Sequence, residues 1–196
     1  METNEKIDLL NLAKKYAELY NKEKDNFPYR LNVINELHDD ENAHSRILIR
    51  LLQYKDKDEY TWLKFFVNRM KDYCEGEFDI EILNPEIKTE HNIGYGRIDG
   101  FIWEKGKYAI IIENKIYASD QWAQLKRYDN FAKAKYTNGY KILYLTLNGH
   151  DPSDEESQKV EYTTISYKHH IVDWLLQCKH LAIDKPMIRE TLKQYI

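Results

Sequence analysis

The chain has 196 residues, a formal net charge of −4, and 42% hydrophobic against 32% charged residues. This composition is typical of a soluble globular protein of one domain, and the negative net charge excludes a protein that coats nucleic acid by bulk electrostatics. No apolar run approaches the roughly 18 residues of a membrane span, no signal peptide is visible, and Cys74 and Cys178 stand in no metal-type or disulfide spacing. We therefore expect a cytoplasmic protein without a membrane partner.

The first ninety residues predict mostly helix. An amphipathic pattern runs from about Thr3 to Lys24 without Gly or Pro, and Phe27-Pro28 ends it. Two further helical patterns cover residues 40–53 and 59–73. We expect residues 1–75 to form a helical segment that packs on a core formed by residues 76–196, the whole being one globular unit.

After Gly76 the sequence changes to a strand type. Residues 78–83, "FDIEIL", alternate apolar and acidic side chains. The segments "RIDGFIW" (97–103) and "KYAIIIENKI" (107–116) are joined by "EKG", which predicts an antiparallel hairpin.

The remainder alternates helix and strand. Ser119 is the expected N-cap of a helix that ends near Lys135, and "GYKILYLTL" (139–147) is another apolar strand. A polar loop, a last strand "EYTTIS" (161–166) and helices over 168–178 and 185–194 follow. This order predicts an α/β fold with a central mixed sheet in αβββαβ order, an N-terminal helical annex and C-terminal helices.

Two charged residues interrupt the most apolar strand. Side chains two apart in a strand share a face, so Glu113 and Lys115 point the same way as Ile111. Either the strand leaves the core after Ile112, which would put both charges in water as an exposed ion pair, or it holds them inside for a chemical purpose.

Asp99 favours the second interpretation, because it lies in the preceding strand beside the same region of the hairpin. Mg²⁺ takes about two protein carboxylates and completes its shell with waters and phosphate oxygens. Asp99 and Glu113 supply the carboxylates, and the cation would offset their buried charge. Lys115 would hold or deprotonate an attacking water, or balance charge in the transition state.

The register of the hairpin tests this hypothesis. If Lys105-Gly106 formed a two-residue turn, Asp99 would pair with Ile112 and lie on the face opposite Glu113. A shared metal site therefore requires an odd-length loop or a bulge, for which the nearby glycines give conformational room.

The segments "RIDG", "IIENK" and "QLKRY" resemble the PD-(D/E)xK nuclease superfamily, in its RecB-like version with a Q-xxx-Y helix. The resemblance extends to "ENAHSRILIRLL", "LYLTLNGHDPS" and "ISYKHHIVDWL", and so covers the chain from about Leu37 to its end. Ile98 stands where the motif's name has Pro, a departure that is frequent in the superfamily and puts little in doubt.

The resemblance implies a restriction-endonuclease-like fold and a set of site residues. Asp99 and Glu113 would be metal ligands, and Lys115 the catalytic lysine. The resemblance also implies a further ligand in the Asn114 carbonyl, a Q-xxx-Y helix with Gln124 and Tyr128, and an acid from the N-terminal helix, Glu41, that joins catalysis and metal binding. The catalytic residues it implies are therefore five, namely Glu41, Asp99, Glu113, Lys115 and Gln124.

For two of these positions the residues leave an alternative open. Gln124 and Tyr128 share a helix face that would turn toward the sheet, but Gln124 could cap a strand end and Tyr128 could be core. Glu41 lies on the same helical stripe as Leu48, which aims it inward. A glutamate in a first turn is equally favoured by the helix dipole.

We expect a Mg²⁺- or Mn²⁺-dependent nuclease that hydrolyses phosphodiester bonds of nucleic acid, an endonuclease with DNA favoured over RNA. A homodimer is compatible with this expectation. Nucleic-acid contacts are predicted for one basic helix, although the same charges could form a solvated face; they are Lys126, Arg127, Tyr128 and Lys133. The alternatives are a binding or assembly module that keeps the fold without turnover, and a phosphohydrolase that acts on nucleotides in a closed, short pocket.

Overall fold

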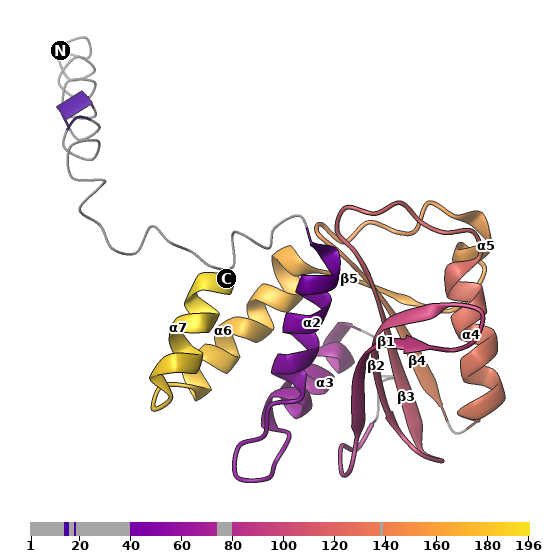
Figure 1. Ribbon diagram of the computed structural model, residues 1–196, viewed down its shortest axis with the longest axis horizontal. Coiled ribbons are helices and arrows are strands. Elements are labelled where there is room, and N and C mark those ends of the chain that lie inside the picture. The colour runs from indigo at the N-terminus through magenta and orange to yellow at the C-terminus, as the bar shows by residue number, and fades with distance from the viewer. Residues whose placement is uncertain (1–13, 16–17, 19–39, 74–79, 138) are drawn as a thin grey trace. The chain divides into compact units, whose positions relative to one another are not determined.

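Helices flank a five-stranded sheet in the computed structural model, which describes residues 14–15, 18, 40–73, 80–137 and 139–196 (Figure 1). The chain divides into two compact units, Met1–Glu36 and Leu37–Ile196. In the first unit Lys14, Lys15 and Glu18 are helical, and the rest of the helix predicted over 3–24 lies outside the described residues. The predicted boundary after residue 75 also lies outside them, so the division into 1–75 and 76–196 stays a prediction.

The sheet is mixed, as predicted. Its strands follow one another in space in the order of the sequence. The first three pair antiparallel and the last two add parallel. Their bounds are β1 Glu86–Asn92, β2 Arg97–Glu104, β3 Tyr108–Lys115, β4 Tyr140–Thr146 and β5 Thr163–Ser166.

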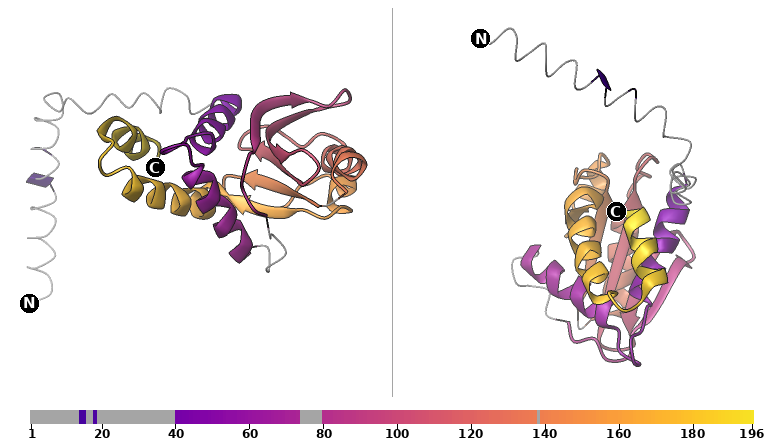
Figure 2. Two further views of the ribbon diagram at one scale, coloured as in Figure 1. Left: turned by 90° about the horizontal axis from the view of Figure 1, so that it is seen from below. Right: turned by 90° about the vertical axis from the view of Figure 1, so that its left-hand side faces the viewer.

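Helices cover both faces of this sheet (Figures 1 and 2). On one face lie α2 (Glu41–Leu52), α3 (Thr61–Tyr73), α6 (Val172–Leu181) and α7 (Pro186–Tyr195), with the short π-helix η4 (Tyr167–Ile171) leading into α6. On the other lie α4 (Gln124–Lys135) and α5 (Glu155–Gln158). No described helix is long and apolar enough to cross a lipid bilayer.

Strand β3 is the centre of the core. Ile110 and Ile112 pack among α2, α3 and α6, whereas Ala109 and Ile111 pack against α4. A strand buried on both faces requires a continuous apolar run, which explains the sequence of its first half.

One local feature fixes the start of helix α2, and another lets the helix lie close to β2. Asp40 caps it, because the Asp40 side chain accepts a hydrogen bond from the Ala43 N–H at 3.0 Å. At Gly100 of β2 an added Cβ would lie 2.8 Å from the Ile49 side chain. Glycine at that position therefore allows the helix to pack directly on the strand.

Two sequence predictions are wrong in detail. Residues 80–83 form no strand, and the first strand begins only after Pro85. Ile82 is buried in the core although it pairs with no strand, so the apolar residues of this segment reflect packing against the core and not a strand. Ser119 is not the N-cap of α4. The helix begins at Gln124 after Ala123, whose backbone is left-handed with φ 51°.

The start of α4 is fixed by residues that are distant in the sequence. The Asp154 carboxylate accepts from the Ala123 N–H at 2.8 Å, and the Ser157 hydroxyl accepts from the Leu125 N–H at 3.1 Å. Because both partners come from the α5 region, no local pattern could have shown this cap.

Candidate active site

The hairpin register aligns the two predicted acids. Strands β2 and β3 pair from Glu104 with Tyr108 to Gly100 with Ile112, around a three-residue loop, 105–107. Gly106 in this loop adopts a left-handed conformation with φ 74°. The loop has the odd length that a shared site requires, because the next position in the register places Asp99 opposite Glu113.

Asp99 is anchored at the end of β3. Its Oδ2 atom accepts a hydrogen bond from the Asn114 N–H at 3.0 Å. The Asn114 side chain turns to the α2 side of the sheet, where its Nδ2 donates to the Ser45 hydroxyl at 2.8 Å. The carboxylate of Asp99 therefore reaches the neighbouring strand between Glu113 and Lys115.

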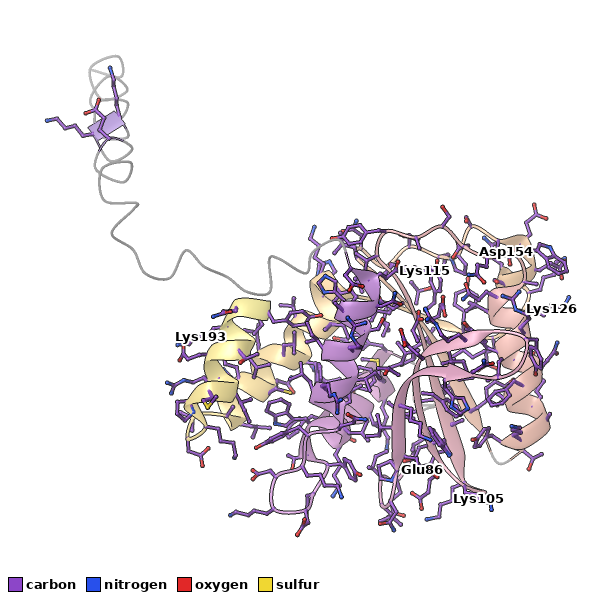
Figure 3. The ribbon with its side chains drawn as sticks, viewed as in Figure 1. Glu86, Lys105, Lys115, Lys126, Asp154 and Lys193 are labelled. Carbon is purple, nitrogen blue, oxygen red and sulfur yellow. The ribbon has the colours of Figure 1, made fainter. Side chains whose placement is uncertain are left out.

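A cavity of about 240 Å³ opens at this end of the hairpin, near Lys115 in Figure 3. The five predicted catalytic residues and Asn114 all line it, whereas the four predicted nucleic-acid contacts do not. Its lining is Glu41, Asn42, Arg97, Asp99, Glu113, Asn114, Lys115, Ala118, Gln121 and Gln124. The fold thus gathers side chains that are up to 83 positions apart, from Glu41 to Gln124.

Glu113 and Lys115 are inside the protein. Their residues are 1% and 8% exposed, and the Lys115 Nζ lies 3.0 Å from the Glu113 Oε1. The strand does not leave the core after Ile112, so the interpretation as an exposed ion pair is wrong. A buried ion pair has a desolvation cost that its attraction alone does not reliably offset.

Two of the three acids that line the cavity, Asp99 and Glu113, have a raised pKa, which favours their protonated forms. Burial, and then the Asp99 carboxylate, raise the pKa of Glu113 to about 8, against the opposing effect of Lys115. Burial also raises the pKa of Asp99, although the Asn114 N–H opposes it. Such shifts in a cleft are typical of functional groups, and a bound cation would reverse them.

Lys115 stays charged. Burial lowers its pKa, but the Glu113, Asp99 and Glu41 carboxylates together outweigh burial, and the net shift of the pKa is upward. The cavity therefore holds a cationic lysine beside two acids of raised pKa.

The first turns of α4 hold Glu113 in place. The Tyr128 hydroxyl lies 2.9 Å from the Glu113 Oε2 and 2.6 Å from the Arg97 carbonyl oxygen, and accepts from the Gln124 Nε2 at 2.9 Å. Tyr128 is fully buried, so it is both core and hydrogen-bond partner. The nucleic-acid contact predicted for Tyr128 is not supported by this position, because the side chain has no exposed surface.

Glu41 faces inward, as one of its two interpretations required. Its Oε1 accepts from the Ile116 N–H and its Oε2 from the Ala118 N–H, each at 3.0 Å. The carboxylate thereby ties the segment after β3 to the first turn of α2.

Comparison with known proteins places this arrangement in a family. The model of the PD-(D/E)XK nuclease superfamily matches residues 30–196, a range that includes the whole cavity. The chain belongs to the PD-(D/E)XK nuclease superfamily. No curated protein and no solved structure matched the chain. Membership of this superfamily indicates a nuclease, and nucleases of this kind generally use divalent metal ions.

The donor set of this nuclease-superfamily site suits a hard cation. Among the described residues no cluster of three or more His, Cys, Asp or Glu side chains could hold a metal, which is unlike a closed zinc site. Mg²⁺ needs only one or two protein carboxylates. The Gln124 side-chain oxygen is buried without a hydrogen-bond partner in the described part of the chain, and Gln124 lines the same cavity. An acceptor of this kind suits a water or ligand in the cavity.

The three basic residues predicted to contact nucleic acid lie on or near the outer side of α4, and each has a partner in the protein. Lys126 pairs with Glu156, Lys133 pairs with Asp129, and Arg127 donates to the Trp122 carbonyl. Their role toward nucleic acid stays a prediction.

Arg97 was missed by the sequence analysis. It lines the cavity and is half exposed, with Nη2 donating to the Asn42 Oδ1 at 3.1 Å and Nη1 lying 3.4 Å from Glu90. The only signal in the sequence was its place two residues before Asp99, and an arginine beside an acid is too common to be distinctive.

Proposed function

We propose that this protein is a Mg²⁺- or Mn²⁺-dependent nuclease that hydrolyses phosphodiester bonds within nucleic acid, with DNA as the favoured polymer. The observation that supports it most is one cavity in which Asp99, Glu113 and Lys115 meet, with both acids raised in pKa and the lysine charged. Membership of a nuclease superfamily supports the same reaction.

Asp99 and Glu113 would hold the cation, and the Asn114 carbonyl and Glu41 are the further ligands proposed. A bound divalent ion supplies Lewis-acid polarisation of a phosphate oxygen and lowers the pKa of a bound water. Glu41 would serve two purposes, since both of its oxygens already accept backbone N–H groups.

The other residues of the cavity would position and balance charge. Lys115 has three donors at one end of Glu113, and can orient an attacking water while its charge offsets the negative charge that grows on the phosphate oxygens. Tyr128 and Gln124 would fix the second oxygen of Glu113. Arg97, half exposed at the cavity, can receive the phosphate as a two-donor fork.

The size of the cavity favours a polymer over a free nucleotide. Sites that enclose a small molecule usually measure about 300 to 1,000 Å³, and this cavity has about 240 Å³. A whole nucleotide would extend beyond it, as one unit of a strand does. The basic residues on α4 would then contact the backbone outside the cavity, namely the exposed Lys126 and Lys133 and the partly buried Arg127.

A cleavage assay tests the proposal. Single- and double-stranded DNA, RNA and mononucleotides are offered with Mg²⁺ or Mn²⁺ to the wild type and to Asp99→Ala and Lys115→Ala. We expect each substitution to reduce cleavage by at least ~100-fold, the effect of removing a group that stabilises charge in a transition state. Lys105→Ala is the matched control, because Lys105 is an exposed lysine at the other end of the same hairpin (Figure 3).

Each other result would contradict a definite part of the proposal. Activity that survives both alanine substitutions would show that the site is wrong. A wild type that cleaves no polymer would favour the binding or assembly module, and hydrolysis of mononucleotides alone would favour the nucleotide phosphohydrolase.

A further inference from the structure

A second cavity, of about 390 Å³, adjoins the proposed catalytic cavity, and none of the roles above uses it. Its lining is mainly apolar and aromatic, and comes from α2, the segment after β3, the segment after β4, the η4–α6 helix and the C-terminal residues. The lining residues that matter below are His44, Ile116, Tyr117, Leu147, Tyr167 and Lys168.

The two cavities share a wall. Lys115 and Ala118 line the proposed catalytic cavity, called the polar cavity below. Ile116 and Tyr117, which lie between them in the chain, line the second, apolar cavity. Consecutive Cα atoms are about 3.8 Å apart, so a single chain segment, which bends after the end of β3, separates the two linings. The Glu41 carboxylate fixes this segment through two backbone hydrogen bonds.

Helix α2, like the segment after β3, contributes residues to both cavities. Glu41 lines the polar cavity, and His44, one turn further along the helix, lines the apolar one. A ligand with an anionic part and a flat apolar part could therefore place one part in each cavity across a single fixed wall.

The second cavity offers rings to a flat ligand. The ring of His44 lies with its centroid 6.2 Å from that of Tyr167 and 5.8 Å from that of Tyr195. Tyr117 and Leu147 are large apolar residues of its lining that remain 56% and 47% exposed. Exposed apolar surface beside a site is typical of a place where a ligand binds.

We propose that the second cavity binds one unstacked nucleobase of the strand whose phosphodiester lies in the polar cavity. This inference rests on the proposed function and specifies its substrate as single-stranded or locally unpaired nucleic acid. Aromatic side chains stack on bases of any sequence, and the volume lies within the range of small-ligand sites. Lys168, which also lines this cavity, is a donor for a base edge or for the adjoining phosphate.

The requirement for an unpaired base follows from the shape of the site. In a duplex both faces of a base are covered by its neighbours, so a base can stack against Tyr117 only after it leaves the helix. A strand without pairing presents its bases at much lower cost, which makes it the preferred substrate.

Equilibrium binding of the full chain tests the inference, with Ca²⁺ in place of Mg²⁺ so that turnover is not required. Fluorescence anisotropy compares a short thymidine oligonucleotide with an abasic oligonucleotide of equal length, which has the same backbone charge and no bases. We expect the wild type to bind the thymidine strand at least ~5-fold more tightly. We expect Tyr117→Ala to remove this preference and Tyr117→Phe, which keeps the ring, to retain it.

Tyr95→Ala is the matched control. Tyr95 is 53% exposed, close to the 56% of Tyr117, and it lines neither of the two cavities. The inference is overturned if the wild type binds both strands equally or binds neither. It is also overturned if Tyr95→Ala reduces the preference as much as Tyr117→Ala does, since that would indicate a general aromatic surface.

The cleavage assay separates this inference from the proposed function. If the wild type cleaves polymers with Mg²⁺ but binds the thymidine and abasic strands equally, only the proposed base site in the second cavity is contradicted. A preference for bases in a wild type that cleaves nothing supports the base site and contradicts the nuclease.

Discussion

The two ends of the β2–β3 hairpin each bury an acid, and the two acids are treated in opposite ways. At the turn end Glu104 is 8% exposed, and its pKa is lowered by Lys107 and by the Asn84 N–H, which lies 3.2 Å from its Oε2. At the open end Glu113 is 1% exposed, and burial raises its pKa to about 8. Figure 3 labels Lys105 and Lys115 at these two ends.

The opposite pKa shifts indicate that Glu104 is a structural acid and that Glu113 is a candidate functional one. Glu104 has partners that favour its charged form, so its charge stabilises the fold at neutral pH. Glu113 has Lys115 and Tyr128 as partners, but burial and Asp99 outweigh them. A carboxylate kept under such conditions is expected where a ligand supplies the missing positive charge.

The largest expected effect compares the two acids in catalysis. We expect Glu113→Gln to lower metal-dependent cleavage by at least ~100-fold, because the amide cannot hold the cation or balance Lys115. Glu104→Gln removes a buried charge from the same hairpin and should leave the rate within about 3-fold. Initial rates on one labelled substrate measure both, and equal losses in the two variants would contradict the assignment.

Thermal unfolding against pH sharpens the comparison. In the window from about 4.5 to 8 the folded state holds a proton on Glu113 that the unfolded state has lost, so the free energy of unfolding falls as pH rises. Glu113→Gln should flatten this fall and be the more stable protein above pH 8 without metal. Glu104, with its lowered pKa, gives stability that is present above about pH 4.5 and lost as pH falls.

Glu104→Gln should therefore lower the melting temperature at neutral pH and above, whereas Glu113→Gln should raise it above pH 8. Melting temperatures are recorded across the pH range in the presence of a chelator. A free energy of 1 kcal/mol corresponds to about 2–4 °C in a chain of this size. Shifts of the same sign in both variants would show that the two ends of the hairpin do not differ.

The smallest expected effect concerns the tyrosine that holds Glu113. Tyr128→Phe removes the hydroxyl that joins Glu113, Gln124 and the Arg97 carbonyl, and we expect a stability loss of about 1 kcal/mol with a loss of about 10-fold in cleavage rate. Tyr140→Phe is the control, because the Tyr140 hydroxyl donates to Asp129 of α4, and neither Tyr140 nor Asp129 lines the proposed catalytic cavity.

The control should lose similar stability and no activity. Chemical denaturation gives the stability of each variant, and initial rates give the activity. If Tyr140→Phe slowed cleavage as much as Tyr128→Phe, the role assigned to Tyr128 in positioning Glu113 would be wrong.

The sequence by itself determined the architecture and the central acids. Strand β3 is visible because a strand buried on both faces needs an apolar run. Helices α2 and α3 are visible because one buried face recurs every 3.6 residues. The spacing of Glu113 and Lys115 also placed them on one face, since strand geometry alternates at every residue.

The tertiary structure decided what depends on contacts between distant segments. The three-residue loop that aligns Asp99 with Glu113 differs by one residue from a turn that would separate them, and the sequence allows both. The start of α4 depends on Asp154 and Ser157, and no local signal marks these as its caps. The position of Arg97 at the catalytic cavity and the existence of the second cavity also depend on packing. The chain segments that line these cavities are brought together only by folding and share no pattern in the sequence.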